Sequence, residues 1–280
     1  MMDADERQLF AAALVGALDG ATDIDAALAG LGWDEALQDD PRVAVSVLFE
    51  WQGRAAASSS ALHAVMGAAL GREPASVVLP RFGTTALPTE RGLALHAPAG
   101  LDARPIRGLD PALGVFEVSG PFDLDEVSAR WDDAIAAGQR ALAHELVGAS
   151  RAMLDLACAH ALERIQFGVP IATFQAVRHR LADSLVAIES AAAAVDAAWD
   201  EPGPLTASVA KALAGRGGRL VTKHCQQVLA GIGFTAEHAF HPYLRRVRVL
   251  DGLLGDARSL TRELGQSLLA AGELPPMLAL

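Results

Sequence analysis

Residues 163–183 read ERIQFGVPIATFQAVRHRLAD. An apolar helical stripe runs through this stretch, but Gly168 and Pro170 interrupt it, and the helical pattern resumes at once with Phe174 and Gln175. Glycine and proline are the residues that most strongly break a helix, so the stretch predicts a short turn between two long helices. An early arginine and two glutamines are polar groups that a core helix does not require. They make the turn a candidate binding site.

Helical patterns extend on both sides of this turn. Apolar residues recur at spacings of three and four before it, over about residues 136–163, and after it, over residues 171–199. A further apolar stripe follows the break at residues 200–206, and another covers residues 236–254. Four long amphipathic helices with short connections predict an antiparallel four-helix bundle.

The chain divides into three zones that differ in amino-acid composition and in the pattern of apolar residues. Residues 1–71 are helical in pattern, with Asp40 expected to cap a helix that starts at Pro41. Residues 72–125 are dense in proline and glycine and contain short apolar runs, which is the composition of strands and turns. Residues 126–280 hold the predicted bundle. The sequence therefore predicts a mainly α fold, with an N-terminal helical domain, a short middle β-domain and a C-terminal four-helix bundle.

The composition argues against several classes of function. The formal net charge of the 280-residue chain is −11, which disfavours binding to nucleic acid. The first residues, MMDADERQLF, are acidic, unlike the start of a secretory signal. The longest apolar run, residues 55–71, is about one turn short of a membrane span. We expect a soluble, cytoplasmic protein that binds neither nucleic acid nor membranes.

The sequence shows no convincing metal or nucleophile motif. Cys158 and Cys225 are far apart and are expected to be small core residues of a reducing compartment. A di-metal site in a bundle requires Glu-x-x-His pairs on two helices, and the nearest cluster, Glu237, His238 and His241, stands alone. That cluster is expected to be a solvated helix start. No G-x-S-x-G elbow and no glycine-rich phosphate fingerprint is present.

A second polar segment covers residues 223–246, KHCQQVLAGIGFTAEHAFHPYLRR. Gln227 precedes a predicted compact turn that contains Ala230 and Gly231. Small residues let a phosphate approach the backbone, and the rigid fork of Arg164 in the first segment suits a phosphate. Each segment alone is also compatible with a plain helix–helix corner.

Together the two segments resemble a known family. R-I-Q-F-G-x-P-I-x-x-F-Q, followed by Q-V-L-A-G-x-G-F-T and Y-L-R-R, is similar to the C-terminal half of the acyl-CoA dehydrogenases. The resemblance is strongest over about residues 130–250. It implies an acyl-CoA dehydrogenase-like fold and assembly as a tetramer, with FAD bound between subunits.

The resemblance also implies which residues bind the cofactor. Arg164 would hold the diphosphate or adenosine end of an FAD seated largely in a neighbouring subunit. Ala230 stands where the family usually has glycine, which is expected to be a mild departure. The full set of implied FAD-binding residues is Arg164, Gln166, Phe167, Gln175, Gln227, Ala230 and Gly231.

The chain departs from the family at the catalytic base. Family members abstract the α-proton of an acyl thioester with a glutamate while the flavin accepts a β-hydride. Relatives carry this glutamate at one of two positions, which here fall at Leu254 and at about Gly138. Neither residue can act as a base, so no catalytic residue is expected in this chain. Should the chain have a base of its own, the candidates are Asp251, Asp256 and Glu145, with Asp256 expected instead to cap the last helix.

The resemblance therefore implies a shortened subunit of a heteromeric acyl-CoA dehydrogenase. Its partner would be a longer homologous subunit in an α2β2 heterotetramer, which would bind the acyl-CoA and supply the base. Steroid or lipid side-chain degradation is the implied setting, with an electron-transfer flavoprotein-type acceptor. Two further interpretations stay open: a self-sufficient homo-oligomeric dehydrogenase with a base at another position, and a flavin-free scaffold that kept the bundle only for assembly.

Overall fold

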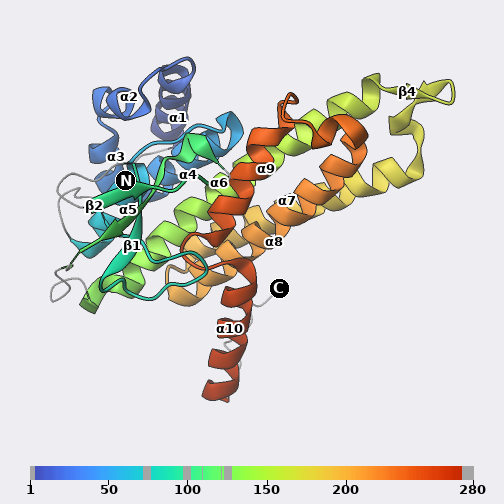
Figure 1. Ribbon diagram of the computed structural model, residues 1–280. Helices are drawn as coiled ribbons and strands as arrows, with labels where there is room; N and C mark the ends of the chain where they lie inside the picture. Colours follow the sequence, from blue (N-terminus) through green and yellow to red (C-terminus); the bar gives the residue numbers. More distant parts are fainter. Residues whose placement is uncertain are drawn as a thin grey trace.

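The computed structural model describes residues 4–71, 77–96, 102–108, 110–120, 122 and 128–272. Within these residues the chain is mainly helical, with a small β-sheet near one end of a long helical bundle (Figure 1). The mainly α fold expected from the sequence is confirmed. None of the described helices combines the length and apolar content that crossing a lipid bilayer requires.

The N-terminal zone is a group of short helices packed on the bundle. The α4 helix starts at the expected position, because the Asp40 side chain accepts a hydrogen bond from the Val43 amide at 3.3 Å and Pro41 occupies the first turn. The helices of this zone are α1 (Ala4–Leu18), α2 (Ile24–Gly30), α3 (Trp33–Asp39), α4 (Pro41–Ala55) and α5 (Ala61–Leu70).

The middle zone forms a three-stranded antiparallel sheet. Its strands are β1 (Arg91–Leu95), β2 (Asp102–Pro105) and β3 (Val115–Ser119), in the order β1-β3-β2. Two of the short apolar runs of the middle zone, GLALHAP and GVFEVSG, therefore contribute β1 and β3. The apolar run that precedes them, SVVLP, contributes an isolated bridge between Leu79 and Leu93.

The C-terminal zone is the expected bundle. The α6 helix (Trp131–Glu163) runs its whole length, and α7 (Gln175–Asp200), α8 (Pro204–Leu229) and α9 (Phe240–Gly252) pack against it (Figure 1). The last helix, α10 (Ala257–Ala271), packs on α8 and projects from the body. Asp256 caps it by accepting hydrogen bonds from the Arg258 and Ser259 amides, as expected.

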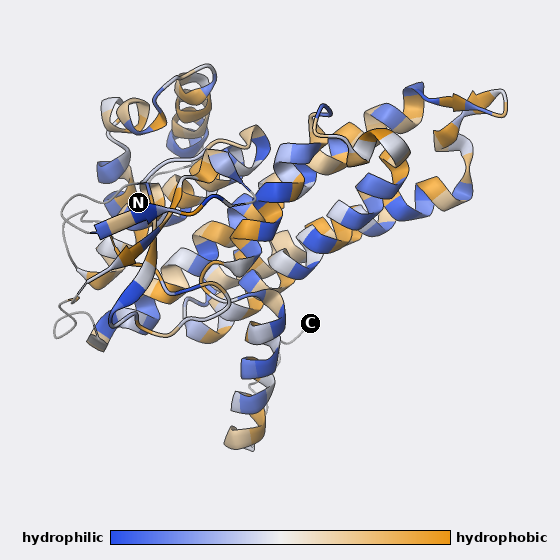
Figure 2. Ribbon diagram, in the orientation of Figure 1, coloured by the Kyte–Doolittle hydropathy of each residue, from blue (hydrophilic) through white to orange (hydrophobic). Residues whose placement is uncertain are grey.

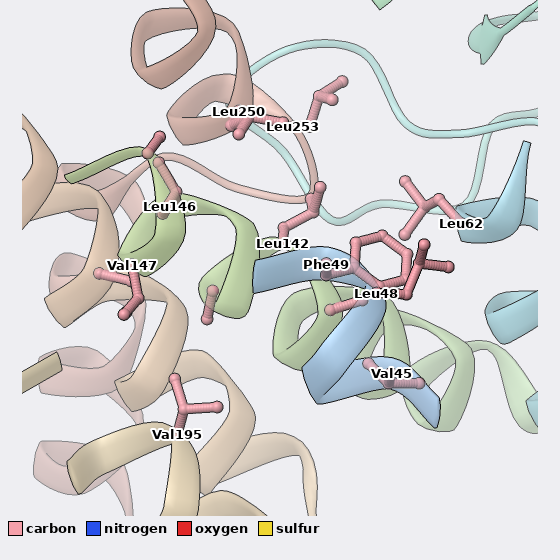
Figure 3. Packing of buried hydrophobic residues seen from close by; sticks show 14 of the residues in the cluster. Val45, Leu48, Phe49, Leu62, Leu142, Leu146, Val147, Val195, Leu250 and Leu253 are labelled. Carbon is pink, nitrogen blue, oxygen red and sulfur yellow. The ribbon is translucent and has the colours of Figure 1, made fainter. Parts of the chain in front are cut away.

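One hydrophobic core joins the N-terminal zone to the bundle. Figure 3 shows part of it, with side chains from α4, α6 and α9. The α4 and α6 helices touch through their backbones, because a Cβ on Gly53 would lie 2.1 Å from the Glu145 carbonyl oxygen and one on Gly148 only 2.2 Å from that of Glu50. This crossing requires glycine on both helices.

A buried arginine connects all three zones. Arg246 of α9 donates to Asp110, which lies between β2 and β3, to Glu145 Oε1 of α6 at 2.8 Å, and to the Ala56 carbonyl oxygen at 3.0 Å. Its side chain is fully buried, so losing either carboxylate would leave a poorly compensated charge in the interior. Arg246 thus fixes the sheet and α4 on the bundle.

Candidate functional site

The interrupted stretch forms a hairpin at the far end of the bundle. After α6 ends, β4 (Ile165–Gln166) and β5 (Val169–Pro170) pair antiparallel, and the short helix η3 (Ile171–Thr173) leads into α7 (Figure 1). Phe167 and Gly168 form the tip, with φ of +54° and +82°. Two positive φ values in succession are typical of a tight two-residue hairpin turn, which explains the glycine.

The hairpin tip displays an aromatic side chain to solvent. Phe167 is 94% exposed, and its ring meets that of Phe174 edge to face with centroids 6.1 Å apart. Leu162 and Ile165 beside it are also more than half exposed. A non-glycine residue at positive φ is strained, and strain of this kind gathers at functional positions. An exposed apolar cluster at a strained tip indicates a surface that contacts another molecule.

The second polar segment forms a compact turn after α8. Ala230 begins the short helix η4 (Ala230–Phe234), and the Gln226 side chain donates to the Gly233 carbonyl oxygen at 3.1 Å. Ala230 has φ +53° and ψ −134°, a conformation that glycine adopts readily and other residues adopt at a cost. The substitution of glycine by alanine here is therefore not the mild departure expected, because it places strain in the turn.

The two segments meet around one pocket of about 420 Å³. Arg164, Gln166, Ala230 and Gly231 line it, so four of the seven expected cofactor residues come together. The other expected residues, Phe167, Gln175 and Gln227, lie exposed outside its lining. The remaining wall residues are His160, Ile171, Val228, Leu229 and Ile232.

Sequence reasoning missed His160 and Gln226, because both lie inside regular helices with no local break to mark them. His160 reaches the pocket from the last turn of α6. Burial lowers the pKa of His160, and the nearby His238 and Arg164 lower it further. Gln226, rather than Gln227, holds the turn of the second segment.

The pocket suits the diphosphate end of an FAD. Its lining contains the Arg164 guanidinium and no carboxylate, and Arg164 has no ion-pair partner among the described residues. A Cβ on Gly231 would meet nothing within 4 Å, so a ligand can approach the backbone there. An arginine fork beside open backbone amides is a common way to bind phosphate oxygens. The volume is within the usual range of small-molecule sites.

The two family positions for the catalytic base meet elsewhere in the molecule. A Cβ on Gly138 would lie 2.5 Å from Cδ1 of Leu254 and 3.1 Å from the sulfur of Met66. Leu254 is fully buried, and its carbonyl oxygen accepts a hydrogen bond from Gln139 Nε2 at 3.0 Å. Apolar side chains therefore occupy the space between the two positions.

Asp251, the first acid that could replace the missing base, is engaged in structural contacts. Its carboxylate binds Arg219 at 2.8 Å and accepts from the Ala257 amide at 3.1 Å. Buried Lys211 donates to the Asp251 and Gly255 carbonyl oxygens at 3.0 and 3.1 Å. Burial lowers the pKa of Lys211 to about 8, although Asp251 opposes the shift. These contacts fix the turn between α9 and α10.

Glu145 and Asp256, the two remaining acids that could act as a base, also have structural partners. Burial raises the pKa of Glu145, an effect that its ion pair with Arg246 opposes. Asp256 is occupied as the cap of α10. Neither of these acids, nor Asp251, therefore projects freely toward a substrate.

A loop of the middle zone packs directly on the turn between α9 and α10. The Gly83 amide donates to the Gly252 carbonyl oxygen at 2.8 Å, and Phe82 packs against Gly252. Trp131 holds the same loop by donating to the Thr85 carbonyl oxygen at 2.8 Å. The loop around Gly83 therefore lies in direct contact with the turn between α9 and α10.

No group of three histidine, cysteine, aspartate or glutamate side chains that could hold a metal ion occurs in the described part of the chain. His238 accepts a hydrogen bond from the Phe240 amide at 3.1 Å, next to the start of α9. Cys225 lies in the core as expected, whereas Cys158 is only partly buried.

Residues 133–269 match the family model for the acyl-CoA dehydrogenase C-terminal domain. This chain belongs to the acyl-CoA dehydrogenase family. The matched range contains both segments that line the pocket and both family positions for the base.

Two curated acyl-CoA dehydrogenases illustrate how the chain relates to its family. Acyl-CoA dehydrogenase FadE34 of Mycobacterium tuberculosis is 34% identical over 239 residues, which are 81% of this chain and 30% of FadE34. Acyl-CoA dehydrogenase IpdE2 of Mycolicibacterium smegmatis is 38% identical over 123 residues, which are 44% of this chain and 40% of IpdE2. The chain thus spans less than half the length of these relatives.

Solved structures share the fold. A chain of the ChsE4-ChsE5 complex from Mycobacterium tuberculosis superposes with a TM-score of 0.77 at 16% identity, covering 98% of this chain and 99% of that one. A chain of a Tcur3481-Tcur3483 steroid ACAD variant gives 0.67 at 23% identity, covering 95% and 88%. Identities this low establish the fold alone.

Proposed function

We propose that this chain is a subunit of a heteromeric FAD-dependent acyl-CoA dehydrogenase and contributes part of the FAD site to a longer homologous partner. The observation that carries the proposal is the separation of two sites along α6. Gly138 lies near the start of this helix and Arg164 directly follows its end. At about 1.5 Å per residue they are about 39 Å apart. This distance is longer than an extended FAD molecule.

One chain therefore cannot place a single FAD against both sites. An FAD whose diphosphate binds Arg164 has its flavin ring in the reaction centre of another chain. The position of the pocket at the end of the bundle supports this arrangement, as do the exposed apolar side chains around it. Phe167 and Ile165 are placed to be covered by the same partner.

The dense packing around Gly138 and Leu254, the two family positions for the base, supports a non-catalytic role for this chain. Leu254 and Met66 fill the space at the family positions for the base, and the loop at Gly83 lies on Gly252. FAD supplies the hydride acceptor for α,β-dehydrogenation of an acyl-CoA thioester. In the proposed complex, Arg164 binds the diphosphate oxygens, the backbone at Gly231 approaches them, and the hairpin excludes water. The partner holds the acyl-CoA and removes the α-proton.

We further propose the composition and setting of the complex. The chain would use residues 1–71, 72–125 and 126–280 as its three domains and assemble with its partner as a cytoplasmic α2β2 heterotetramer. Support comes from the fold shared over nearly the whole chain with a member of the ChsE4-ChsE5 complex. The Tcur3481-Tcur3483 protein is a steroid ACAD, which supports a steroid or lipid side-chain substrate. An electron-transfer flavoprotein-type protein would accept the electrons.

Co-expression tests the proposal. The chain is purified alone and together with a longer acyl-CoA dehydrogenase homologue from the same genome, and FAD is quantified by absorbance. The expected result is a nearly colourless isolated chain and a yellow complex that contains both chains. One FAD per isolated chain would contradict the proposal and favour the self-sufficient dehydrogenase. A stable complex without flavin would favour the scaffold.

A further inference from the structure

Two basic side chains lie on one face at the end of α6. His160 and Arg164 are joined by the last helical hydrogen bond, in which the Arg164 amide donates to the His160 carbonyl oxygen at 2.9 Å. Residues at this spacing are neighbours on the surface of a helix. Both residues line the pocket of about 420 Å³. Figure 2 shows hydrophilic residues where α6 ends and hydrophobic residues in the hairpin that follows. His160 therefore lies beside the guanidinium that is proposed to bind the diphosphate.

The ring of His160 is available to a ligand. It makes no hydrogen bond and no ion pair with the described part of the chain, and it is only partly buried. A neutral imidazole offers one donor and one acceptor, and a protonated one offers two donors. Other histidines use their ring nitrogens within the fold, namely His63, His144, His224 and His238. A ring with unused nitrogens in the wall of a pocket can contact what the pocket binds.

The groups around His160 keep its ring neutral in the free chain. Burial lowers the pKa of His160, and His238 and Arg164 lower it further, whereas Glu163 raises it. The ordinary pKa of a histidine is about 6.5, so a lowered value leaves the ring mostly uncharged at pH 7. The remaining lining residues, which come from β4, η3, α8 and η4, are all uncharged.

A bound anion reverses this balance. A negative charge close to the ring favours the protonated imidazole and opposes the effects of burial and of Arg164. The protonated ring then donates a charge-assisted hydrogen bond, which is shorter and stronger than a neutral one. His238 does not offer Nδ1 in the same way, because that nitrogen accepts a hydrogen bond from the Phe240 amide at 3.1 Å. His160 is therefore the histidine of this pocket that can gain a proton together with a ligand.

We propose that His160 is the second cation of this pocket, which takes up a proton when a diphosphate binds and donates to the phosphate oxygens beside Arg164. The inference deepens the proposed function and rests on it for the identity of the anion. The diphosphate of FAD is a diester whose charge does not change between pH 6 and pH 8, so the proton is taken up by the protein. Because the bound state holds more protons than the free state, the affinity increases as the pH falls.

ADP-ribose is a suitable probe, because it carries the same kind of diphosphate diester as FAD and has no flavin ring to place. Its binding to the purified full chain is measured by isothermal titration calorimetry at pH 6 and pH 8. The wild-type chain should bind it about tenfold more tightly at pH 6, since uptake of one proton changes the affinity by at most about tenfold per pH unit. The binding heat in buffers of different ionisation enthalpy should show net proton uptake.

Two substitutions of His160 separate a charge effect from a structural one. His160→Gln should bind ADP-ribose at both pH values as weakly as the wild-type chain does at pH 8. His160→Lys carries its charge at both pH values and should bind at pH 8 about as tightly as the wild-type chain does at pH 6. His179→Gln is the matched control, because His179 is an exposed histidine of α7 outside the pocket lining, and it should retain the wild-type pH dependence.

Four results would overturn the inference. They are equal wild-type affinity at the two pH values, a pH dependence that persists in His160→Gln, a His160→Lys variant that binds no better than His160→Gln at pH 8, and no binding of ADP-ribose to the wild-type chain at millimolar concentration. None of these measurements involves a partner subunit, whereas the FAD content of the co-expressed complex tests the proposed function. A complex that holds FAD with no contribution from His160 would leave the proposed function intact and remove this inference.

Discussion

Single residues around the Arg164 pocket combine binding chemistry with strain. Arg164 and Gly231 offer a cation and an open backbone, whereas Phe167 and Ala230 both hold positive φ. Strained residues persist when the surrounding structure fixes them, and they gather where a ligand or partner binds. At Ala230 the strain comes from one methyl group, so it can be removed without changing the charge of the site.

We predict that Ala230→Gly stabilises the protein. The native φ and ψ of Ala230 cost an alanine about 1–3 kcal/mol, and glycine avoids this cost while losing about 0.5–1 kcal/mol of unfolded-state entropy. The free energy of unfolding should rise by about 1 kcal/mol in urea denaturation. A decrease would show that the alanine methyl group makes packing contacts that outweigh the strain.

A buried histidine gives the fold a sensitivity to acid. Trp199 Nε1 donates to His144 Nε2 at 3.0 Å, so this nitrogen must be unprotonated in the native state. Burial lowers the pKa of His144 to about 4, an effect that the charges of Glu50 and Asp196 oppose. Because the unfolded chain binds the proton near the ordinary pKa of about 6.5, its contribution to stability is full above that pH and falls between 6.5 and 4.

We predict that His144→Gln reduces this acid sensitivity. The wild-type protein should lose about 2 kcal/mol of unfolding free energy through His144 between pH 7 and pH 5, and the variant should not. Buried His63 also has a lowered pKa, chiefly from burial, and adds a loss in the same direction that both proteins share. Denaturation curves at the two pH values measure the difference. An equal loss in both proteins would contradict the assignment.

At the scale of elements, local sequence predicts the helices and their ends but not how they touch. The break at Gly168 and Pro170 and the cap at Asp256 were predictable, because turn and capping signals lie within a few residues. The ion pairs of Arg246 with Asp110 and Glu145 were not predictable, because these partners lie 136 and 101 residues away from Arg246 in the sequence. The spacing of apolar residues indicates which face of a helix is buried, but it does not indicate which element packs against that face.

In the candidate site, too, some features were predictable from the sequence and others were not. Motif resemblance predicted that Arg164 and Gly231 meet, and it placed Leu254 and Gly138 at the empty base positions, which lie against each other. It could not predict the conformation of the turn at position 230, because backbone dihedrals there depend on how η4 closes onto α8.

We predict that Gly148→Ala severely weakens the crossing of α4 and α6. The added methyl group would overlap the Glu50 carbonyl oxygen, so the helices must separate, at a cost of about 2–3 kcal/mol. Gly16→Ala is the matched control, because its Cβ meets nothing within 4 Å and alanine favours the α1 helix. Thermal unfolding compares the two variants. Equal melting temperatures would contradict the backbone contact at this crossing.

At the scale of the whole molecule, the chain has an open site at one end and a closed centre about 39 Å away along α6. The N-terminal helices and the sheet are fixed on the bundle near the closed centre, through Arg246 and the loop at Gly83. The other end of the bundle, with Phe167 at its tip, extends beyond them (Figure 1). This asymmetry suits a subunit that binds one end of a cofactor whose other end lies in a neighbouring subunit.

The central claim is that Arg164 binds FAD belonging to another chain, and FAD affinity of the assembled complex tests it most directly. A charged hydrogen bond contributes about 1.5–3 kcal/mol, so Arg164→Ala should weaken FAD binding about ten- to a hundred-fold, with the melting temperature of the isolated chain nearly unchanged. Arg178→Ala, an exposed arginine of α7 outside the pocket lining, is the control and should leave the affinity unchanged. Unchanged FAD affinity in the Arg164→Ala complex, together with a lower melting temperature, would contradict the claim and make Arg164 a structural residue.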